Sequence, residues 1–463
     1  MFALRTFTVA LAATLAGGCS LIPDYLRPAA PVPQVFPNAP QVAADAPAAD
    51  SVAWRDHFSD ARLREVIALA LANNRDLRVA ALNIEKARAQ YGIQRADLYP
   101  AIGANAGQTA QRLPDGSGGG DVSRTYSATV GFSAYELDFF GRIRSLNAQA
   151  LELYLATEEA RRSAQISLVA EVANAWLTLA ADREHLALAQ RTLETRQKSF
   201  DLTQRSFDAG AVSALDLRQV ETLLQGARAD AARYRSVVAQ DEHALALLAG
   251  APLPAEWLPA ELPDGITAVA ELPAGVPSET LTRRPDILQA ERALRAANAS
   301  IGAARAAFFP RITLTAGAGT ASTSLGDLFG SGSGTWSFIP QLRVPIFEAG
   351  RLQASLDVAE VQRDIQVAQY EKAIQSAFRE VADVLAERAT LAEQLDARRR
   401  LVEATAASFR LSDARYQAGV DSYLGLLDAQ RALYVAEQGL IGVRLTDVAN
   451  RVTLYKVLGG GWR

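Results

Sequence analysis

Four short segments of the chain alternate between apolar and small polar residues. They cover about residues 100–111, 124–137, 311–322 and 335–347. A period of two residues places neighbouring side chains on opposite faces of a β-strand, so each segment predicts a strand. One face is apolar, and the other carries mostly Ser, Thr, Gly and Asn, which are too small to fill a core. Such strands are typical of a membrane barrel with a water-filled lumen, and the edge of a soluble β-sandwich is the alternative.

Long stretches of helical periodicity follow each pair of strands. Apolar residues recur at helical spacing from Arg142 to Ala209 and again from about Ala214 to Leu248. No proline occurs in residues 115–251 or 346–463. The first of these helices, with about 67 residues, would rise on the order of 100 Å. Because Gly210 follows it and glycine suits a helix C-cap, the sequence predicts long helical hairpins.

The pattern of helix, strands and helical hairpin occurs twice. Residues 95–102 (RADLYPAI) match residues 305–312 (RAAFFPRI) at an offset of 210, and Gly141-Arg142 matches Gly350-Arg351 at an offset of 209. Such agreement indicates duplication of a unit of about 210 residues. In the first copy, the leading helix is predicted from a cap at Ser59-Asp60 to about Leu98. The predicted segments are a signal peptide (1–18), a tether (19–58), the first repeat (59–250), a proline-rich connection (251–280) and the second repeat (281–463).

The N-terminus has the layout of a bacterial lipoprotein signal. Arg5 precedes the apolar run Phe7–Leu15, and the small residues Ala16-Gly17-Gly18 come directly before Cys19, the only cysteine in the chain. This order predicts that residues 1–18 are removed and that Cys19 receives N-acyl and S-diacylglycerol lipid. Ala16 stands where such signals usually carry Leu, and an unmodified thiol is the alternative. Ser20 is not acidic, which favours delivery to the outer membrane, and the Pro/Ala-rich segment after it predicts an extended tether.

The composition argues against several classes of function. A net charge of −4 provides no basic field for nucleic acid. One cysteine and three scattered histidines do not indicate a metal site, and no nucleophile and base stand together as in an enzyme. No cofactor motif is expected, since Gly116–Gly120 lacks the Lys-Ser/Thr of a phosphate-binding loop and reads as an external loop.

Membrane insertion is expected to depend on the strands. After residue 18 we expect no stretch to reach the roughly 18 apolar residues of a membrane-spanning helix. Four strands cannot close a barrel around a lumen, and open sheet edges are not tolerated in lipid. Several protomers must then share one barrel, and three of them would supply about twelve strands.

Further motifs extend over the mature chain, and together they carry a resemblance to a known family. They are Cys19–Val32 (CSLIPDYLRPAAPV), Trp54–Phe58 (WRDHF), Arg283–Asp286 (RRPD), Phe347–Arg351 (FEAGR), Tyr416–Gly419 (YQAG) and Asp428–Arg431 (DAQR). With them the chain resembles the outer membrane factors of tripartite efflux systems, the TolC-like exit ducts, and within them the lipidated OprM type. The fold class that this implies is mainly α with a membrane β-barrel: a trimer whose shared 12-stranded barrel continues into a long α-helical barrel.

The resemblance also implies a function and partners. The chain would be the passive outer-membrane duct of a multidrug pump of the RND type, lipid-anchored and extending into the periplasm. Its partners would be a periplasmic adaptor protein and an inner-membrane transporter. The adaptor would meet the tips of the two helical hairpins, whose residues are Ala209, Gly210, Ala211, Val212 and Ser213, and Ala418, Gly419, Val420, Asp421 and Ser422.

A closing ring at the periplasmic aperture is the most specific site that the resemblance implies. Its residues in this chain would be Leu424, Asp428 and Arg431, with Tyr416 before the turn. Asp428 and Arg431 are three positions apart and share a helix face. An ordinary exposed ion pair, worth a few tenths of a kcal/mol, is the alternative role. At the repeat offset their counterparts are Gln219 and Thr222, so only the second hairpin carries the charge pair.

Two other functions are open at this stage. A non-conducting coiled-coil lipoprotein of the cell envelope would explain the helices, but not the strands with a small polar face. An envelope hydrolase would need an acid–base cluster, and the sequence does not present one.

Overall fold

The computed structural model describes residues 20–33, 35–37, 49–112, 121–267, 278–421 and 423–462, and the chain divides into two compact units. Unit 1 comprises Met1–Ala29, Asn83–Glu158 and Gln289–Glu371. Unit 2 comprises Ala30–Leu82, Glu159–Leu288 and Lys372–Arg463. Each unit therefore draws on both sequence repeats, because the long helices pass from one unit into the other.

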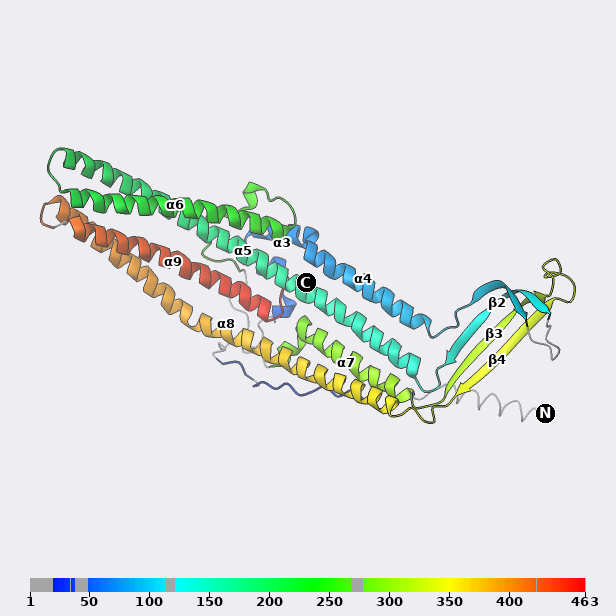
Figure 1. The fold of residues 1–463 in the computed structure, drawn as a ribbon. Helices are drawn as coiled ribbons and strands as arrows, with labels where there is room; N and C mark the ends of the chain where they lie inside the picture. The colour runs from blue at the N-terminus through cyan, green and yellow to red at the C-terminus, as the bar shows by residue number, and fades with distance from the viewer. Residues whose placement is uncertain are drawn as a thin grey trace. The chain divides into compact units, whose positions relative to one another are not determined.

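The two repeats have the same order of elements, as the colours of Figure 1 show. The first repeat contains α4 (Arg75–Ala96), β1 (Gly103–Arg112), β2 (Val122–Leu137), α5 (Arg142–Asp208) and α6 (Ala214–Ala249). The second contains α7 (Pro285–Ala306), β3 (Arg311–Ser322), β4 (Gly334–Arg343), α8 (Arg351–Gln417) and α9 (Tyr423–Val457). Helices α5 and α8 both have 67 residues, and α4 and α7 both have 22. The predicted duplication is confirmed.

Unit 1 contains a four-stranded antiparallel sheet in the order β1-β2-β3-β4 (Figure 1). The register puts apolar residues opposite one another on one face, as in the cross-strand row Ala104, Val130, Ala318, Trp336. The next row, on the opposite face, is Gly103, Gly131, Gly317, Ser337. Trp336 is 81% and Val130 56% exposed, so the described part of the chain leaves these positions of the apolar face uncovered. The predicted alternation thus produces a sheet with one apolar and one small polar face.

A β-bulge in β2 keeps the apolar face continuous. The pairing of β2 with β3 shifts between Phe132 and Tyr135, where Ala134 has a positive φ of 53°. The extra residue changes which positions of β2 face each side. As a result Tyr135 continues the apolar face of Phe132, and Glu136 moves to the opposite face.

Unit 2 is a packed helical body. The central part of α5 supplies its largest fully buried side chain, Trp176, whose indole Nε1 donates to the carbonyl oxygen of Trp257 at 2.9 Å. Helix α3 (Ala61–Asn73) adds an apolar face at helical spacing, and its N-cap Asp60 accepts from the backbone of Arg62 and Leu63, as predicted. Other fully buried residues are Leu63, Val66, Ile67, Ala70, Leu177, Leu179, Leu245, Ile266 and Val452.

The helix that we expected to run unbroken to about Leu98 is interrupted. Asn74 ends α3 and caps α4, because its side-chain Oδ1 accepts from the backbone of Leu77 at 2.9 Å and its Nδ2 donates to the carbonyl of Leu248 at 2.9 Å. The β-strands are also somewhat different from those predicted: β1 begins at Gly103 and β4 ends at Arg343.

The last part of the expected tether is folded. Residues 49–58 contain a 3₁₀ turn, η1 (Ala49–Ser51), and a short helix, α2 (Trp54–His57). Trp54, His57 and Phe58 are buried in unit 2, where the ring of His57 stacks on Tyr455 at 3.8 Å. The aromatic residues of this segment gain more from burial than an extended, solvated chain would allow. Two short 3₁₀ segments, η2 (Ala255–Trp257) and η3 (Ser278–Arg283), lie in and after the proline-rich connection.

One expectation about membrane-spanning helices was wrong. Within the described residues α5 contains an 18-residue window that is apolar enough to cross a membrane by length and composition. Of that window 61% is buried inside the structure. This burial is typical of a helix that supplies the core of a helical body.

Candidate functional site

Both helical hairpins of unit 2 turn with the same backbone geometry. At the end of α5, Gly210 has φ 77° and the backbone N–H of Ala211 donates to Ser206 at 2.8 Å. At the end of α8, Gly419 has φ 71° and Val420 donates to Arg415 at 3.0 Å. These left-handed caps close the helices as the glycines predicted. Figure 1 shows both turns at the same end of unit 2.

Polar side chains brace each turn. In the first turn, Ser213 and Asp216 form a capping box at the start of α6. In the second, the guanidinium of Arg415 donates to both carboxylate oxygens of Asp421, at 2.5 and 2.9 Å. Hydrogen bonds from Arg415 lower the pKa of Asp421. The tip residues Ala209, Gly210, Ala211, Ser213, Ala418, Gly419, Val420 and Asp421 are exposed and Val212 is half-buried, whereas Ser422 lies outside the described residues.

Three of the expected gate residues form an exposed stripe on α9. Leu424, Asp428 and Arg431 follow one another at spacings of four and three, and all three are exposed. The Nη1 of Arg431 lies 3.4 Å from Oδ1 of Asp428. Tyr416 does not join this pair, since its ring lies against Tyr423 with 5.0 Å between centroids.

The sequence did not single out Arg196, which lies on α5 close to this stripe. Arg196 is only 7% exposed, although arginine is rarely buried without a partner. Burial lowers the pKa of Arg196, and the like charge of Arg431 lowers it further. No local sequence pattern around Arg196 indicates that its side chain is buried, because residues of α8 and α9, far away in the sequence, help to bury it.

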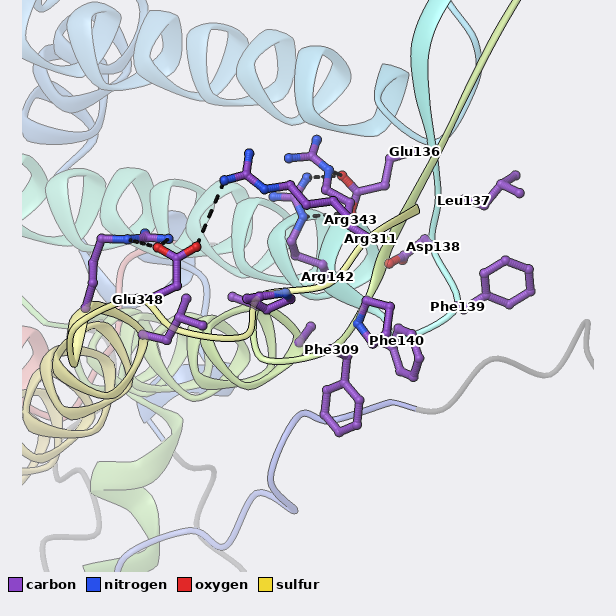
Figure 2. Close-up of a pocket in the computed structure, with 16 residues that line it drawn as sticks. Glu136, Leu137, Asp138, Phe139, Phe140, Arg142, Phe309, Arg311, Arg343 and Glu348 are labelled. Carbon is purple, nitrogen blue, oxygen red and sulfur yellow. Dashed lines mark hydrogen bonds and ion pairs between the residues drawn. The ribbon is translucent and has the colours of Figure 1, made fainter. Parts of the chain in front are cut away.

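In unit 1 a second polar cluster joins the strands to the helices. Figure 2 shows Glu136 of β2 facing Arg142 and Arg311. Arg142, in the first turn of α5, donates twice to the Glu136 carboxylate at 2.8 Å, and Arg311 at the start of β3 approaches it to 2.5 Å. A cavity of about 300 Å³ lies beside them, with Phe140 and Phe309 stacked in its wall. The cluster ties the end of β2 to the beginnings of α5 and β3.

None of these sites has the arrangement of a catalytic centre. His57 and His185 are packed against tyrosine rings, and His243 is exposed. Long helical hairpins with braced turns, joined to a sheet with one apolar and one small polar face, define instead a channel-type protein of a membrane.

The comparison with known protein families agrees with this class. The profile of the outer membrane efflux protein family matches residues 66–251 and residues 276–460, once for each repeat. The chain therefore belongs to the outer membrane efflux protein family, a family of channels and not of enzymes.

Characterised relatives match almost the whole chain. The toluene efflux pump outer membrane protein TtgC of Pseudomonas putida is 52% identical over 98% of this chain and 95% of its own length. The antibiotic efflux pump outer membrane protein ArpC of Pseudomonas putida has the same identity and coverage. The cation efflux system protein CusC of Escherichia coli O6:H1 is 42% identical over 99% of both chains.

Solved structures have the same fold. The open-state MtrE outer membrane channel of Neisseria gonorrhoeae superposes with a TM-score of 0.87 at 42% identity, covering 96% of this chain and 99% of that one. A CusC structure gives a TM-score of 0.86 at 40% identity, with 96% and 100% coverage. The TolC-like outer membrane channel fold, with long helices and four strands in two repeats, is confirmed.

Proposed function

We propose that this protein is the trimeric exit duct of a tripartite efflux pump. Three chains share a 12-stranded barrel in the outer membrane and an α-helical barrel in the periplasm. The duct is passive, and the energy comes from an inner-membrane transporter of the RND type. Membership in a channel family favours this function over a non-conducting envelope spacer.

The sheet of unit 1 is the observation that carries the proposal. Among the residues that the structure describes, β1 and β4 each pair on one side only, so both edges of the sheet are open there. An open edge in lipid leaves unsatisfied backbone groups, each costing several kcal/mol, and closure into a barrel removes both edges. Pairing of β4 with β1 of the next chain, repeated three times, closes a barrel of about twelve strands. The apolar face, with Trp336 and Phe338, then meets lipid, and the Gly/Ser/Thr face lines the lumen.

The ends of the two hairpins are the proposed coupling and gating region. Exposed residues at these ends, such as Leu215 and Val420, are 67% and 62% exposed and suit contact with the helical hairpin of a periplasmic adaptor. Leu424, Asp428 and Arg431 would meet their symmetry copies at the narrow end of the helical barrel. Tyr416, packed on Tyr423, would set the position of the turn before them.

A lipid anchor on Cys19 completes the proposal. Cys19 and the signal peptide lie outside the described residues, so the support comes from the order of residues in the signal and from the placement of the segment after Ser20. That segment is fixed to unit 1, because Asn298 of α7 donates to the carbonyl of Pro23 at 2.7 Å. An anchor at Cys19 would then be held close to a defined place on α7.

The cargo class is inferred from the relatives. Relatives with 47–52% identity include proteins named for antibiotic, solvent and toluene efflux, whereas the cation efflux protein CusC is 42% identical. We therefore propose organic solvents and antibiotics as cargo.

The test combines assembly and transport. Native mass spectrometry of detergent-solubilised protein should give the mass of three lipidated chains. In a host that lacks its own exit duct, the protein expressed with a cognate adaptor and pump should restore export of toluene or of an antibiotic. A stable monomer, or assembled trimers that restore no export with any such pump, would contradict the proposal.

A further inference from the structure

A small cavity in unit 2 lies between three long helices near the second hairpin turn. Its volume is about 200 Å³, and it is lined by Leu188, Arg191, Thr192, Thr195, Arg196, Phe409, Gln430, Leu433, Tyr434 and Glu437. Since one water molecule takes about 30 Å³ of liquid volume, the cavity has room for a small ion with some water.

The charge of Arg196 is not balanced by the protein around it. Among the residues that the structure describes, no carboxylate lies within 4.0 Å of its guanidinium, and the buried Nη1 has no hydrogen-bond partner. Asp230, whose negative charge acts on Arg196, already accepts a hydrogen bond from the hydroxyl of Tyr434 at 3.1 Å. A buried cation without a partner is strongly unfavourable, so such a group requires a counter-charge.

The rest of the lining is rich in donors. Arg191 brings a second guanidinium, and Thr192 and Gln430 bring a hydroxyl and an amide. Glu437 is the one carboxylate among the lining residues, and burial raises its pKa, which Arg191 only partly offsets. Two cations, neutral donors and one weakened acid are the chemistry of an anion site.

We propose that this cavity binds a small anion, such as chloride or phosphate, on the guanidinium of Arg196. The bound anion would supply the counter-charge that the surrounding helices lack. It would also reduce the repulsion between Arg196 and Arg431, which places the site next to the proposed gate. The proposal concerns this cavity alone and does not depend on channel activity.

The test is thermal unfolding of the full-length purified protein while sodium phosphate is titrated at constant ionic strength. The wild type should show a saturable rise in melting temperature of about 2–4 °C. Arg196→Gln should abolish this rise, and without phosphate it should melt at a higher temperature than wild type because it removes a buried, unpaired charge. Arg196→Lys keeps the positive charge but loses the planar guanidinium, so its affinity for phosphate should be at least about fivefold weaker than that of the wild type. Arg205→Gln changes the same charge at an exposed position of α5 and should respond as wild type.

Diffraction from bromide-soaked crystals locates the ion independently of folding effects. An anomalous peak beside Arg196 in the wild type would support the proposal even if Arg196→Gln fails to fold. A wild type without a phosphate response, or with the same response in Arg196→Gln, would overturn it. The proposal would also be overturned if a carboxylate of a second copy of the chain pairs with Arg196. In that case Arg196→Gln would lose the oligomer, and the wild-type crystals would show no bromide peak.

Discussion

The carboxylate of Glu136 and the guanidinium of Arg142 form a bidentate pair, with both N–O distances at 2.8 Å, across the turn from β2 to α5. Glu136 faces Arg142 only because the bulge after Phe132 adds one residue to β2 and so reverses the side of the sheet to which the following side chains point. The pair therefore links the orientation of side chains at the end of β2 to the position at which α5 begins. Glu136 is only 8% exposed, so the pair lies in a partly desolvated position.

Replacing Glu136 with Gln should destabilise unit 1 by about 2–3 kcal/mol, because Arg142 and Arg311 lose a shared anionic partner. The free energy of unfolding in detergent, from a denaturant titration, measures this. Glu348→Gln is the matched control at the same junction, since Glu348 pairs with Arg351, which is 64% exposed, and should cost less than about 1 kcal/mol. Equal losses in both variants would show that burial of Glu136 has no special role.

The gate prediction concerns Asp428 and Arg431. In one chain they form an exposed pair worth less than about 1 kcal/mol. At a constriction shared by three chains, charge-assisted contacts contribute about 1.5–3 kcal/mol each. Asp428→Ala and Arg431→Ala should each raise the open probability in single-channel recordings, and the double variant should be less than additive. The exposed pair of Glu194 and Lys198 on α5 is the control, and Glu194→Ala should leave gating unchanged.

A partly buried acid in unit 2 should make stability depend on pH. Burial, a hydrogen bond with Asp182 and the negative charge of that residue together raise the pKa of Asp241 to about 6. Between the ordinary pKa of 3.8 and this value the folded state binds more protons than the unfolded state. Stability should therefore decrease as pH rises through that window.

Asp241→Asn should remove this dependence and raise stability at pH 7 by about 1–2 kcal/mol. Melting temperatures measured from pH 4 to pH 8 test the prediction, with the exposed residue Asp201, replaced by Asn, as control. If Asp241→Asn keeps the wild-type dependence of melting temperature on pH, Asp241 is not the group that causes this dependence.

The N-terminal segment should be released by a change at Glu291, which is 2% exposed on α7. Tyr25, Arg27 and Arg295 all donate to its carboxylate, Arg27 with the shortest contact of 2.6 Å. Burial favours the protonated form of Glu291, but the hydrogen bonds from Arg27 and Arg295 outweigh it and hold its pKa below the usual range. The contribution of Glu291 to stability is thus present at neutral pH and is lost as pH falls through that lowered pKa.

Glu291→Gln should make opening of residues 21–27 easier by about 1.5–3 kcal/mol, seen as faster amide hydrogen exchange in that segment alone. Glu152→Gln removes the partner of Arg292, a different residue of α7, and should leave exchange of the segment unchanged. Unaltered exchange in Glu291→Gln would mean that contacts other than the charge cluster hold the segment.

Periodicity predicted most of the fold from the sequence. Alternation located the strands and their faces, because side chains of a strand point to opposite sides with a strict period of two. Repeated motifs and the absence of proline predicted two long helical hairpins. Gly210 and Gly419 marked the turns, since left-handed caps favour glycine.

Features that depend on tertiary contacts were missed. Ala134 takes a positive φ that its residue type does not indicate, so the bulge in β2 was not predicted. The break at Asn74 depends on the carbonyl of Leu248, far along the chain. The gate residues came from a family resemblance, and the structure brings Asp428 and Arg431 together without Tyr416. Burial of Arg196 depends on two helices of the other repeat.

The most direct test of the account is single-channel conductance of the purified, full-length protein in planar lipid bilayers. If three chains close one barrel, protein of trimeric mass should give discrete conductance steps. The open probability of the channel should increase when Asp428 is replaced by Ala. Trimeric protein that inserts into the bilayer and never conducts, in wild type or in Asp428→Ala, would contradict the account, as would conducting monomers.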